Sequence, residues 1–579
     1  MAQAPQSVVA EAPQLAVRSL ALPVAPDDLE ILLSQTGRRP NIVLICSAPN
    51  EPSVAIELAM ERGDWEWAGR ALMRSLAVPR IVAGSGRDVV QVVIEHKEFG
   101  ESEPLLLAGA ALAQSWVDIA EFALARAGSE LTETAEPEAT DVLSLAILNM
   151  AMSKLRDEPA IGLTEARHVT ELIAKLSVSE RAQSPELAPL IDYYVAGFEL
   201  SIGNLDTAKW RLERGAGPLQ QLLKDDVNPA EQLVRANCAG QLSWIDAFSG
   251  DLRRATRYAT ALLTDRRADS GECGVRFAHL ATVWTHLERG EVEQARQRLD
   301  HALSTASDNQ EPLLAAAQLL TEARLAIVTG EPETAIRVLK SASKIDSPVS
   351  GWFADQFMIA TADAWLAAGE PEQAIAAFSF EPDLAPAEGR VILGRALRRV
   401  GKLQDAEAIL AGIPSDPAAI SLITQVQCWL LGAEIAVEQG NRERAELLVE
   451  RALRAASREA LRTTVAAAGD WLRSFVARDS DLSSRYSAFL ASVAETAVST
   501  VDHRRENASA YDALFVVPLT VRETDVLKRL AEFCSNEEIA EDLVLSLNTV
   551  KTHMRSLFQK LSVTRRADAV RRGRALGLC

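Results

Sequence analysis

A glycine followed five positions later by an alanine recurs along this chain at nearly regular intervals. In the last seven copies the steps from one glycine to the next are 47, 40, 40, 39, 32 and 39 residues. This pattern predicts a helix, a turn in which glycine takes the left-handed position after the helix, and a second helix that packs closely through the small alanine. The eight copies are Gly63/Ala68, Gly203/Ala208, Gly250/Ala255, Gly290/Ala295, Gly330/Ala335, Gly369/Ala374, Gly401/Ala406 and Gly440/Ala445.

Helical hairpins of this kind cannot bury their apolar faces alone, so they are expected to stack and share one core. The glycine and alanine at this offset resemble the tetratricopeptide repeat, although the period of roughly 40 residues exceeds the usual 34 of that family. The longer period is similar to the repeats in the sensor region of MalT-type regulators. This resemblance implies a curved α-solenoid whose concave face receives a ligand or a protein partner. A helical array that binds no ligand is the alternative.

Composition limits the classes to which the chain can belong. Hydrophobic residues make up 48% and charged residues 24%, which is typical of a folded globular chain. The formal net charge of −20 excludes a uniformly basic nucleic-acid coat protein, but not a small basic module. Six scattered cysteines without C-x-x-C spacing indicate reduced thiols rather than a zinc ribbon or a disulfide framework. Because neither a secretory signal nor a membrane-spanning apolar run is recognisable, we expect a cytoplasmic protein without a membrane segment.

The residues before the regular repeats lack a nucleotide-binding signature. Residues 1–40 are rich in Ala, Pro and Gln, which predicts a tail without fixed structure. Residues 41–46 (NIVLIC) are either a strand or the start of a buried helix. Further on, AIELAMERGDWEWAGRAL and EPLLLAGAALA resemble the segment that joins the NTPase unit of MalT-type proteins to their repeats. A phosphate loop needs G-x-x-x-x-G-K-[ST], and Asn50-Glu51-Pro52 replaces the Gly-Lys-Thr, so we expect no nucleotide hydrolysis.

The last part of the chain, residues 518–579, carries the start signals of four short helices. Two capping boxes and two single N-caps mark them: Thr520–Glu523, Ser535–Glu538, Ser546 and Thr564. Only two residues separate the expected end of the second helix from the third N-cap. Two helices joined by so short a turn form a helix-turn-helix unit, here spanning Ser535 to Met554.

The third of these helices has one apolar and one cationic face. Its apolar residues fall at i, i+4, i+7 and i+11, which is a single stripe: Val550, Met554, Leu557 and Leu561. The opposite face has cations and hydrogen-bonding groups but no acid: Asn548, Lys551, Thr552, Arg555 and Gln559. From Leu545 to the end there are eight basic residues and one acidic residue, in a chain that is acidic as a whole. A helix of this kind fits the major groove of B-DNA, where Lys and Arg donate hydrogen bonds to guanine.

These residues resemble the LuxR/GerE-type DNA-binding domain over its full length. The resemblance is carried by LTVRETDVLKRLAE, SNEEIAEDLVLSLNTVKTH and KLSVTRRADAVRRGRALGL. It implies base contacts by Lys551, Thr552 and Arg555, and phosphate contacts by Ser546, Asn548, Thr549 and Arg566. It also implies that the last helix, about residues 565–576, mediates dimer contacts on DNA. Phe533 departs from the family pattern, which favours glycine at the end of the first helix.

The sequence therefore predicts an all-α chain, an α-solenoid followed by a four-helix DNA-binding domain. The expected parts are a disordered tail (1–40), a helical MalT-like segment (41–128), the repeat array (129–495), a linker (496–517) and the helix-turn-helix domain (518–579). We interpret the chain as a transcriptional regulator with no catalytic, cofactor or metal site. Expected partners are double-stranded DNA, RNA polymerase, a second copy of the chain on DNA and an effector in the array. A protein-interaction scaffold with a helix-turn-helix unit that does not bind DNA is the alternative.

Overall fold

The computed structural model confirms an all-α chain in the residues that it describes. They are residues 59, 62–74, 77–84, 87–96, 102–178, 181, 184–222, 228–264, 273–304, 312–341, 351–378, 385–414, 420–496, 519–531, 534–543, 545–560, 566 and 569–570. Of these residues 84% are helical, and no strand occurs among them. The expected tail, the NIVLIC stretch, most of the linker, Phe533, Leu561 and nearly all of the fourth C-terminal helix fall outside these residues.

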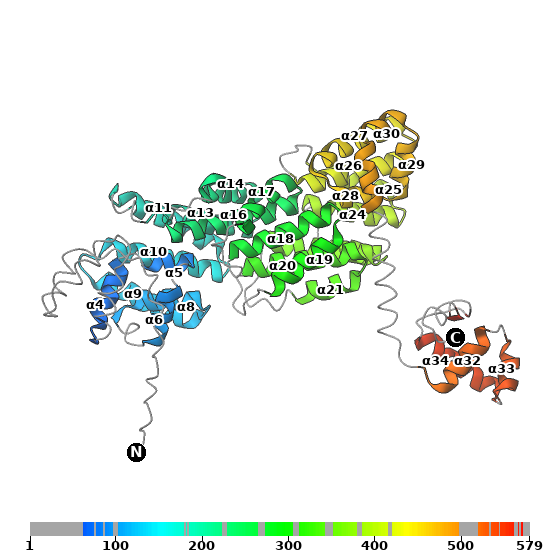
Figure 1. Cartoon of the computed structure of the whole chain (residues 1–579), viewed down its shortest axis with the longest axis horizontal. Helices are drawn as coiled ribbons and strands as arrows, with labels where there is room; N and C mark the ends of the chain where they lie inside the picture. The colour runs from blue at the N-terminus through cyan, green and yellow to red at the C-terminus, as the bar shows by residue number, and fades with distance from the viewer. Residues whose placement is uncertain are drawn as a thin grey trace, which may run out of the picture.

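Antiparallel helices follow one another in hairpins from the first described residues to residue 496 (Figure 1). The helices before the regular repeats are α4 (Trp65–Arg74), α5 (Ala77–Ala83), α6 (Arg87–Glu95), α8 (Pro104–Ala113), α9 (Val117–Glu133), α10 (Ala139–Leu155) and α11 (Pro159–Lys175). The middle of the array contains α13 (Leu187–Ser201), α14 (Leu205–Ala216), α15 (Leu219–Leu222), α16 (Pro229–Ser249), α17 (Leu252–Thr264), α18 (Cys273–Glu288), α19 (Val292–Ser304), α20 (Pro312–Thr329) and α21 (Pro332–Lys340). Its last part contains α22 (Trp352–Ala367), α23 (Pro371–Ala376), α24 (Ala387–Arg399), α25 (Leu403–Ala411), α26 (Leu422–Glu438), α27 (Arg442–Glu459), α28 (Arg462–Ala466), α29 (Asp470–Ala477) and α30 (Ser480–Arg485).

Every glycine of the repeated pattern lies in the turn that the sequence predicts. All eight have a positive φ, between 75° and 95°. The residue after each glycine donates its backbone N–H to a carbonyl five positions earlier, as Asp251 does to Asp246 (2.8 Å) and Asn441 to Ala436 (2.8 Å). This is the Schellman bond that closes the end of a helix.

The residue after the glycine also starts the next helix. Its carbonyl accepts the N–H of the alanine of the repeated pattern, which lies four positions later. Asp251 accepts from Ala255 in this way (3.0 Å), and Asn441 from Ala445 (3.2 Å). One residue therefore closes the first helix and opens the second, which fixes the angle between them. The eight alanines are 0% exposed, so a larger side chain at these positions would push the paired helices apart.

Three further hairpins have the same turn without a glycine. Ser115, Asp157 and Ala460 are the non-glycine residues with positive φ in the described part of the chain, at 54° to 58°. The residue after each makes the same five-residue bond, for example Trp116 to the Ala111 carbonyl (2.8 Å). Non-glycine residues adopt this conformation at a cost, so a search for glycine misses these turns.

The hairpin of α8 and α9 spans the expected boundary at residue 128. The position between residues 128 and 129 falls inside α9, and the repeat geometry already begins at α8. The acidic stretch 129–141 is helical at both ends, with only residues 134–138 between the helices. Glu130 and Glu133 lie on exposed positions of α9, Glu136 and Glu138 lie between the two helices, and Asp141 of α10 is buried.

Successive hairpins pack through very close helix contacts. A Cβ atom on Gly240 of α16 would lie 2.0 Å from the carbonyl oxygen of Gly274 of α18. A Cβ atom on Gly274 would in turn lie 2.3 Å from the Ala236 carbonyl oxygen. The two backbones therefore touch where no side chain fits. The helix α20 is apolar enough by composition to cross a membrane, but it is a partly buried helix of this core, packed between α18, α21 and α22.

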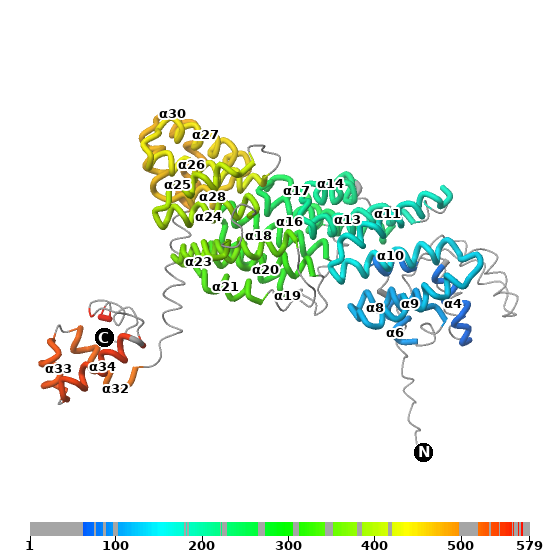
Figure 2. Tube along the Cα trace, turned by 180° about the vertical axis from the view of Figure 1, so that it is seen from behind, coloured from blue at the N-terminus to red at the C-terminus, as the bar shows by residue number. Residues whose placement is uncertain are grey.

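The last helices of the array pack back onto its middle. The carboxylate of Glu288, at the end of α18, is 0% exposed and accepts hydrogen bonds from Arg324 of α20 (2.8 Å) and from the Thr464 hydroxyl of α28 (2.7 Å). Thr464 lies 176 positions further along the chain. Both views of the molecule show α26 and α28 beside the α16–α18 region (Figure 2). The last helices of the array are therefore fastened to its middle.

The C-terminal helices α32 (Val521–Ala531), α33 (Asn536–Asp542) and α34 (Leu547–Lys560) form a core of their own. Its most deeply buried side chains are at most 1% exposed: Val526, Leu527, Leu530, Ile539, Val550 and Leu557. Beside this core the carboxylate of Glu523 accepts hydrogen bonds from Ser556 (2.6 Å) and Lys560 (2.7 Å) of α34 and from the Thr520 backbone (2.7 Å). Burial would raise the pKa of Glu523, but these hydrogen bonds outweigh it and lower the pKa to about 2.

The turns provide a matched pair of substitutions. Gly440→Ala places a Cβ at a φ of 76° in open space, so only backbone strain should act, and we expect a loss of about 1 kcal/mol in local stability. Ala460→Gly relieves the same strain at the next turn and should stabilise it by up to about 1 kcal/mol. Native-state hydrogen exchange of the α26–α28 amides measures both. Opening free energies that move in the same direction for the two variants would contradict this account of the turn.

The Glu523 network predicts a pH dependence. Because the folded pKa lies below the ordinary value of 4.5, the carboxylate stabilises the domain above pH 4.5, and this contribution declines as the pH falls toward 2. Glu523→Gln should cost roughly 2 kcal/mol near neutral pH and flatten the pH dependence. Hydrogen exchange of the α32 and α34 amides in the full chain tests this. The control Glu541→Gln, at an exposed position of α33, should behave like the wild type.

Candidate nucleic-acid interface

The turn between α33 and α34 is defined by capping at both helix starts. Ser535 and Glu538 form the predicted capping box of α33, each side chain bonded to the backbone of the other. At the end of α33, the Leu545 N–H donates to the Ala540 carbonyl (2.9 Å). The Ser546 hydroxyl then accepts the Thr549 N–H (3.1 Å), which makes Ser546 the N-cap of α34. These bonds leave a turn of only a few residues, as a helix-turn-helix unit requires.

The two faces of α34 are separated as the sequence predicts. Val550 and Leu557 are 0% exposed and pack on α32 and α33, with Met554 partly buried beside them. On the other side the following residues are exposed: Asn548, Lys551, Thr552 and Arg555. Packing of the apolar stripe thus turns the cationic side of the helix to solvent.

The cations of α34 divide into two groups. Lys560 forms an ion pair with Glu523 inside the domain. Lys551 and Arg555, one helical turn apart, have no acidic partner within 4.0 Å among the described residues. Both remain available to an external anion or to base edges. The Thr552 hydroxyl donates to the Asn548 carbonyl (2.9 Å), so toward a ligand it presents its oxygen as an acceptor.

The start of α34 places small polar groups together. The hydroxyls of Ser546 and Thr549 lie 2.7 Å apart and share the capping of the helix. A helix N-terminus of this kind, with free backbone N–H groups and hydroxyls, suits a phosphate group. Ser546, Asn548 and Thr549 therefore lie together at the end of α34 where the sequence predicts phosphate contacts, and those contacts stay a prediction.

Arg566 occupies a different place from the other predicted residues. Its guanidinium donates to the Cys534 backbone carbonyl and to the Asn536 side-chain oxygen at the start of α33. It is partly buried and fastens the chain after α34 to α33. Its predicted phosphate contact is untested, and this internal role was not apparent from the sequence, because nothing in the spacing marks Cys534 as its partner.

Comparison with known proteins identifies one family for this segment. Residues 517–572 match the GerE family, described as "Bacterial regulatory proteins, luxR family". Among solved structures, a Rap protein complexed with competence and sporulation factor is 15% identical, with a TM-score of 0.40 over 62% of this chain and 98% of that chain. A structure of Naa15/Naa10 bound to HypK-THB is 12% identical, with a TM-score of 0.18 over 88% of this chain and 93% of that chain.

The capped turn, the buried stripe of α34 and the family match all concern the same segment. The chain thus carries, behind its array of helical hairpins, a C-terminal helix-turn-helix domain of the luxR family of bacterial regulatory proteins.

Proposed function

We propose that the chain is a sequence-specific transcription regulator of the cytoplasm whose C-terminal domain binds operator DNA as a dimer. The observation that carries the proposal is the exposed, acid-free face of α34 with Lys551 and Arg555 at its centre. In this proposal α34 lies in the major groove, and Lys551, Thr552 and Arg555 contact base edges. Ser546, Asn548 and Thr549 contact phosphate at the N-terminus of the helix.

The charge distribution supports this orientation. The chain has a net charge of −20, so DNA repels most of it. From Leu545 onward eight basic residues face one acidic residue, and the acids of the domain are concentrated on α32 and α33. Positive charge is therefore concentrated in the sequence from the start of α34 onward, which supports an approach to DNA with α34 first.

The repeat array is proposed to be the sensor. It receives a small-molecule or protein effector and alters either DNA binding or contact with RNA polymerase. Such control requires that the effector bind the two states of the protein with different affinity. The proposed activity is regulatory and not catalytic.

DNA binding can be tested with one pair of double variants. Sites are first selected from random duplex DNA with the full chain. The affinity of Lys551→Ala/Arg555→Ala is then compared with that of the wild type across a salt series. Each lost base contact is worth about 1–3 kcal/mol, so we expect the double variant to bind at least about 10²-fold more weakly, with a salt slope that is smaller by up to about 2.

The matched control is Arg522→Ala/Lys528→Ala, which removes the same charge from exposed positions of α32. It should change affinity much less than the α34 pair. Equal binding by the α34 variant and the wild type at every salt concentration would reject the assigned face. If random selection yields no enriched site at all, the result would favour the alternative of a protein-interaction scaffold.

A further inference from the structure

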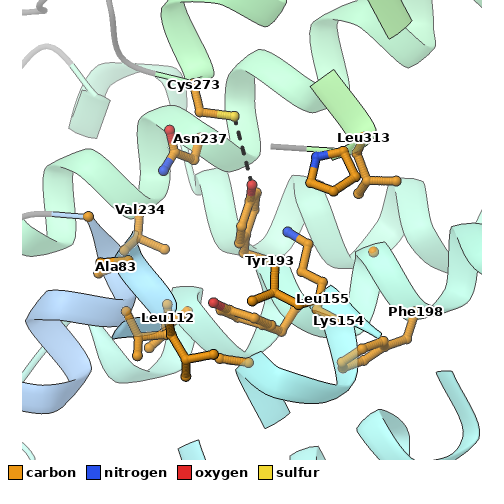
Figure 3. A pocket seen from close by; sticks show the side chains of 18 of the residues that line it. Ala83, Leu112, Lys154, Leu155, Tyr193, Phe198, Val234, Asn237, Cys273 and Leu313 are labelled. Carbon is orange, nitrogen blue, oxygen red and sulfur yellow. Dashed lines mark hydrogen bonds between the residues drawn. The ribbon is translucent and has the colours of Figure 1, made fainter. Parts of the chain in front are cut away.

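A cavity of about 290 Å³ lies where eight helices of the array converge. Its wall takes residues from α5, α8, α10, α13, α16, α18, α20 and α22, which lie up to about 270 positions apart in sequence. Figure 3 shows Leu112, Tyr193, Val234, Cys273 and Leu313 around this space, each from a different helix. The volume is near the lower limit of the range of roughly 300–1,000 Å³ that small-molecule sites occupy.

Most of the wall is apolar. Leu112, Leu155, Val234, Leu313 and Phe198 contribute aliphatic and aromatic surface. Phe198 is held by Gly162 of α11, where a Cβ atom would lie 2.2 Å from its ring. A ligand body that fills this space gains from leaving water, so an apolar moiety is favoured.

The polar groups of the wall gather around Lys154 of α10. Its ammonium lies 4.1 Å from the centre of the Tyr193 ring and 5.1 Å from that of Tyr194, so the two rings hold the cation in place. The Tyr193 hydroxyl lies 3.9 Å from the Cys273 sulfur. The Asn237 oxygen accepts the Gly274 N–H (2.9 Å), which leaves its NH₂ group as the part offered to a ligand.

Only one acid, Asp157 in the turn after α10, reaches the wall among the described lining residues. Lys154 is the one cation among them, and the Asn237 NH₂ group is a second hydrogen-bond donor beside the apolar space. We propose that this cavity is the effector site of the array and that it takes a small amphipathic anion. The ligand has an aliphatic or aryl body in the apolar part and a carboxylate directed to Lys154. This inference rests on the proposed function only for calling the ligand an effector.

The enclosure by eight helices also explains how occupancy is felt across the array. A ligand in this cavity touches hairpins from α5 to α22 at once. Binding therefore favours one arrangement of those hairpins over others, which is the differential affinity that a sensor needs.

The test uses the full chain and isothermal titration calorimetry with octanoate, decanoate and 4-phenylbutanoate, and with octan-1-ol as a neutral counterpart. For ligands of about this size we expect Kd values of roughly 10 μM to 1 mM for the carboxylates. Lys154→Met should weaken carboxylate binding by roughly 10- to 100-fold and leave octan-1-ol unaffected. Lys175→Met is the control, because it removes an exposed lysine from the neighbouring helix α11.

A second variant fills the cavity. A Cβ atom on Gly197 of α13 would lie 3.6 Å from both Leu313 and Lys154, so Gly197→Leu places its side chain in the space and should abolish binding of all four probes. Gly128→Leu on α9 is its control, since nothing lies within 4 Å of that Cβ position. Circular dichroism melting of every variant monitors folding. If Gly197→Leu does not fold, Lys154→Met decides.

Three results would overturn the proposal: no saturable binding of any carboxylate, octan-1-ol binding as tightly as octanoate, or wild-type carboxylate affinity in Lys154→Met. Because these titrations contain no DNA, they are independent of the DNA-binding test. A failure here leaves the assigned face of α34 intact, and a failure of that face leaves the cavity result intact.

Discussion

The repeat array depends on one backbone device, a left-handed residue followed by a residue that closes one helix and opens the next. Eight glycines and the residues Ser115, Asp157 and Ala460 provide it. Because the device fixes the angle within each hairpin, the hairpins stack at similar geometry and bury the alanines on their seams. The cavity bordered by eight helices is a consequence of that stacking, since no single hairpin contains it.

Much of this architecture was predictable, because glycine is the residue that most often signals a positive φ. The turns at Ser115, Asp157 and Ala460 were not, since non-glycine residues adopt a positive φ too rarely for a sequence pattern to signal it. The faces of α34 followed from helical periodicity and capping, both of which are local. The bonds of Glu523 to Lys560 and of Arg566 to Cys534 join residues more than 30 positions apart and carried no recognisable signal. The cavity could not be predicted either, because the residues that line it come from eight helices far apart in the sequence.

The charges of the C-terminal domain serve two purposes. Lys560 and Arg566 are used inside the domain, the first against a buried carboxylate and the second against a backbone carbonyl. Lys551 and Arg555 have no such use among the described residues, and they project from the face that packing leaves uncovered. A count of basic residues does not make this distinction. The contacts of each side chain make it, because they separate the cations that stabilise the domain from those that can bind a partner.

The bond between Glu288 and Thr464 has an evolutionary consequence. Linear repeat proteins lengthen readily by duplication, because each unit touches only its neighbours. Here the helices between α18 and α28 form a loop fastened at both ends, so a gained or lost unit would carry Thr464 away from a carboxylate that is 0% exposed. Relatives of this chain should therefore vary in hairpin number outside that loop, and keep the number within it constant.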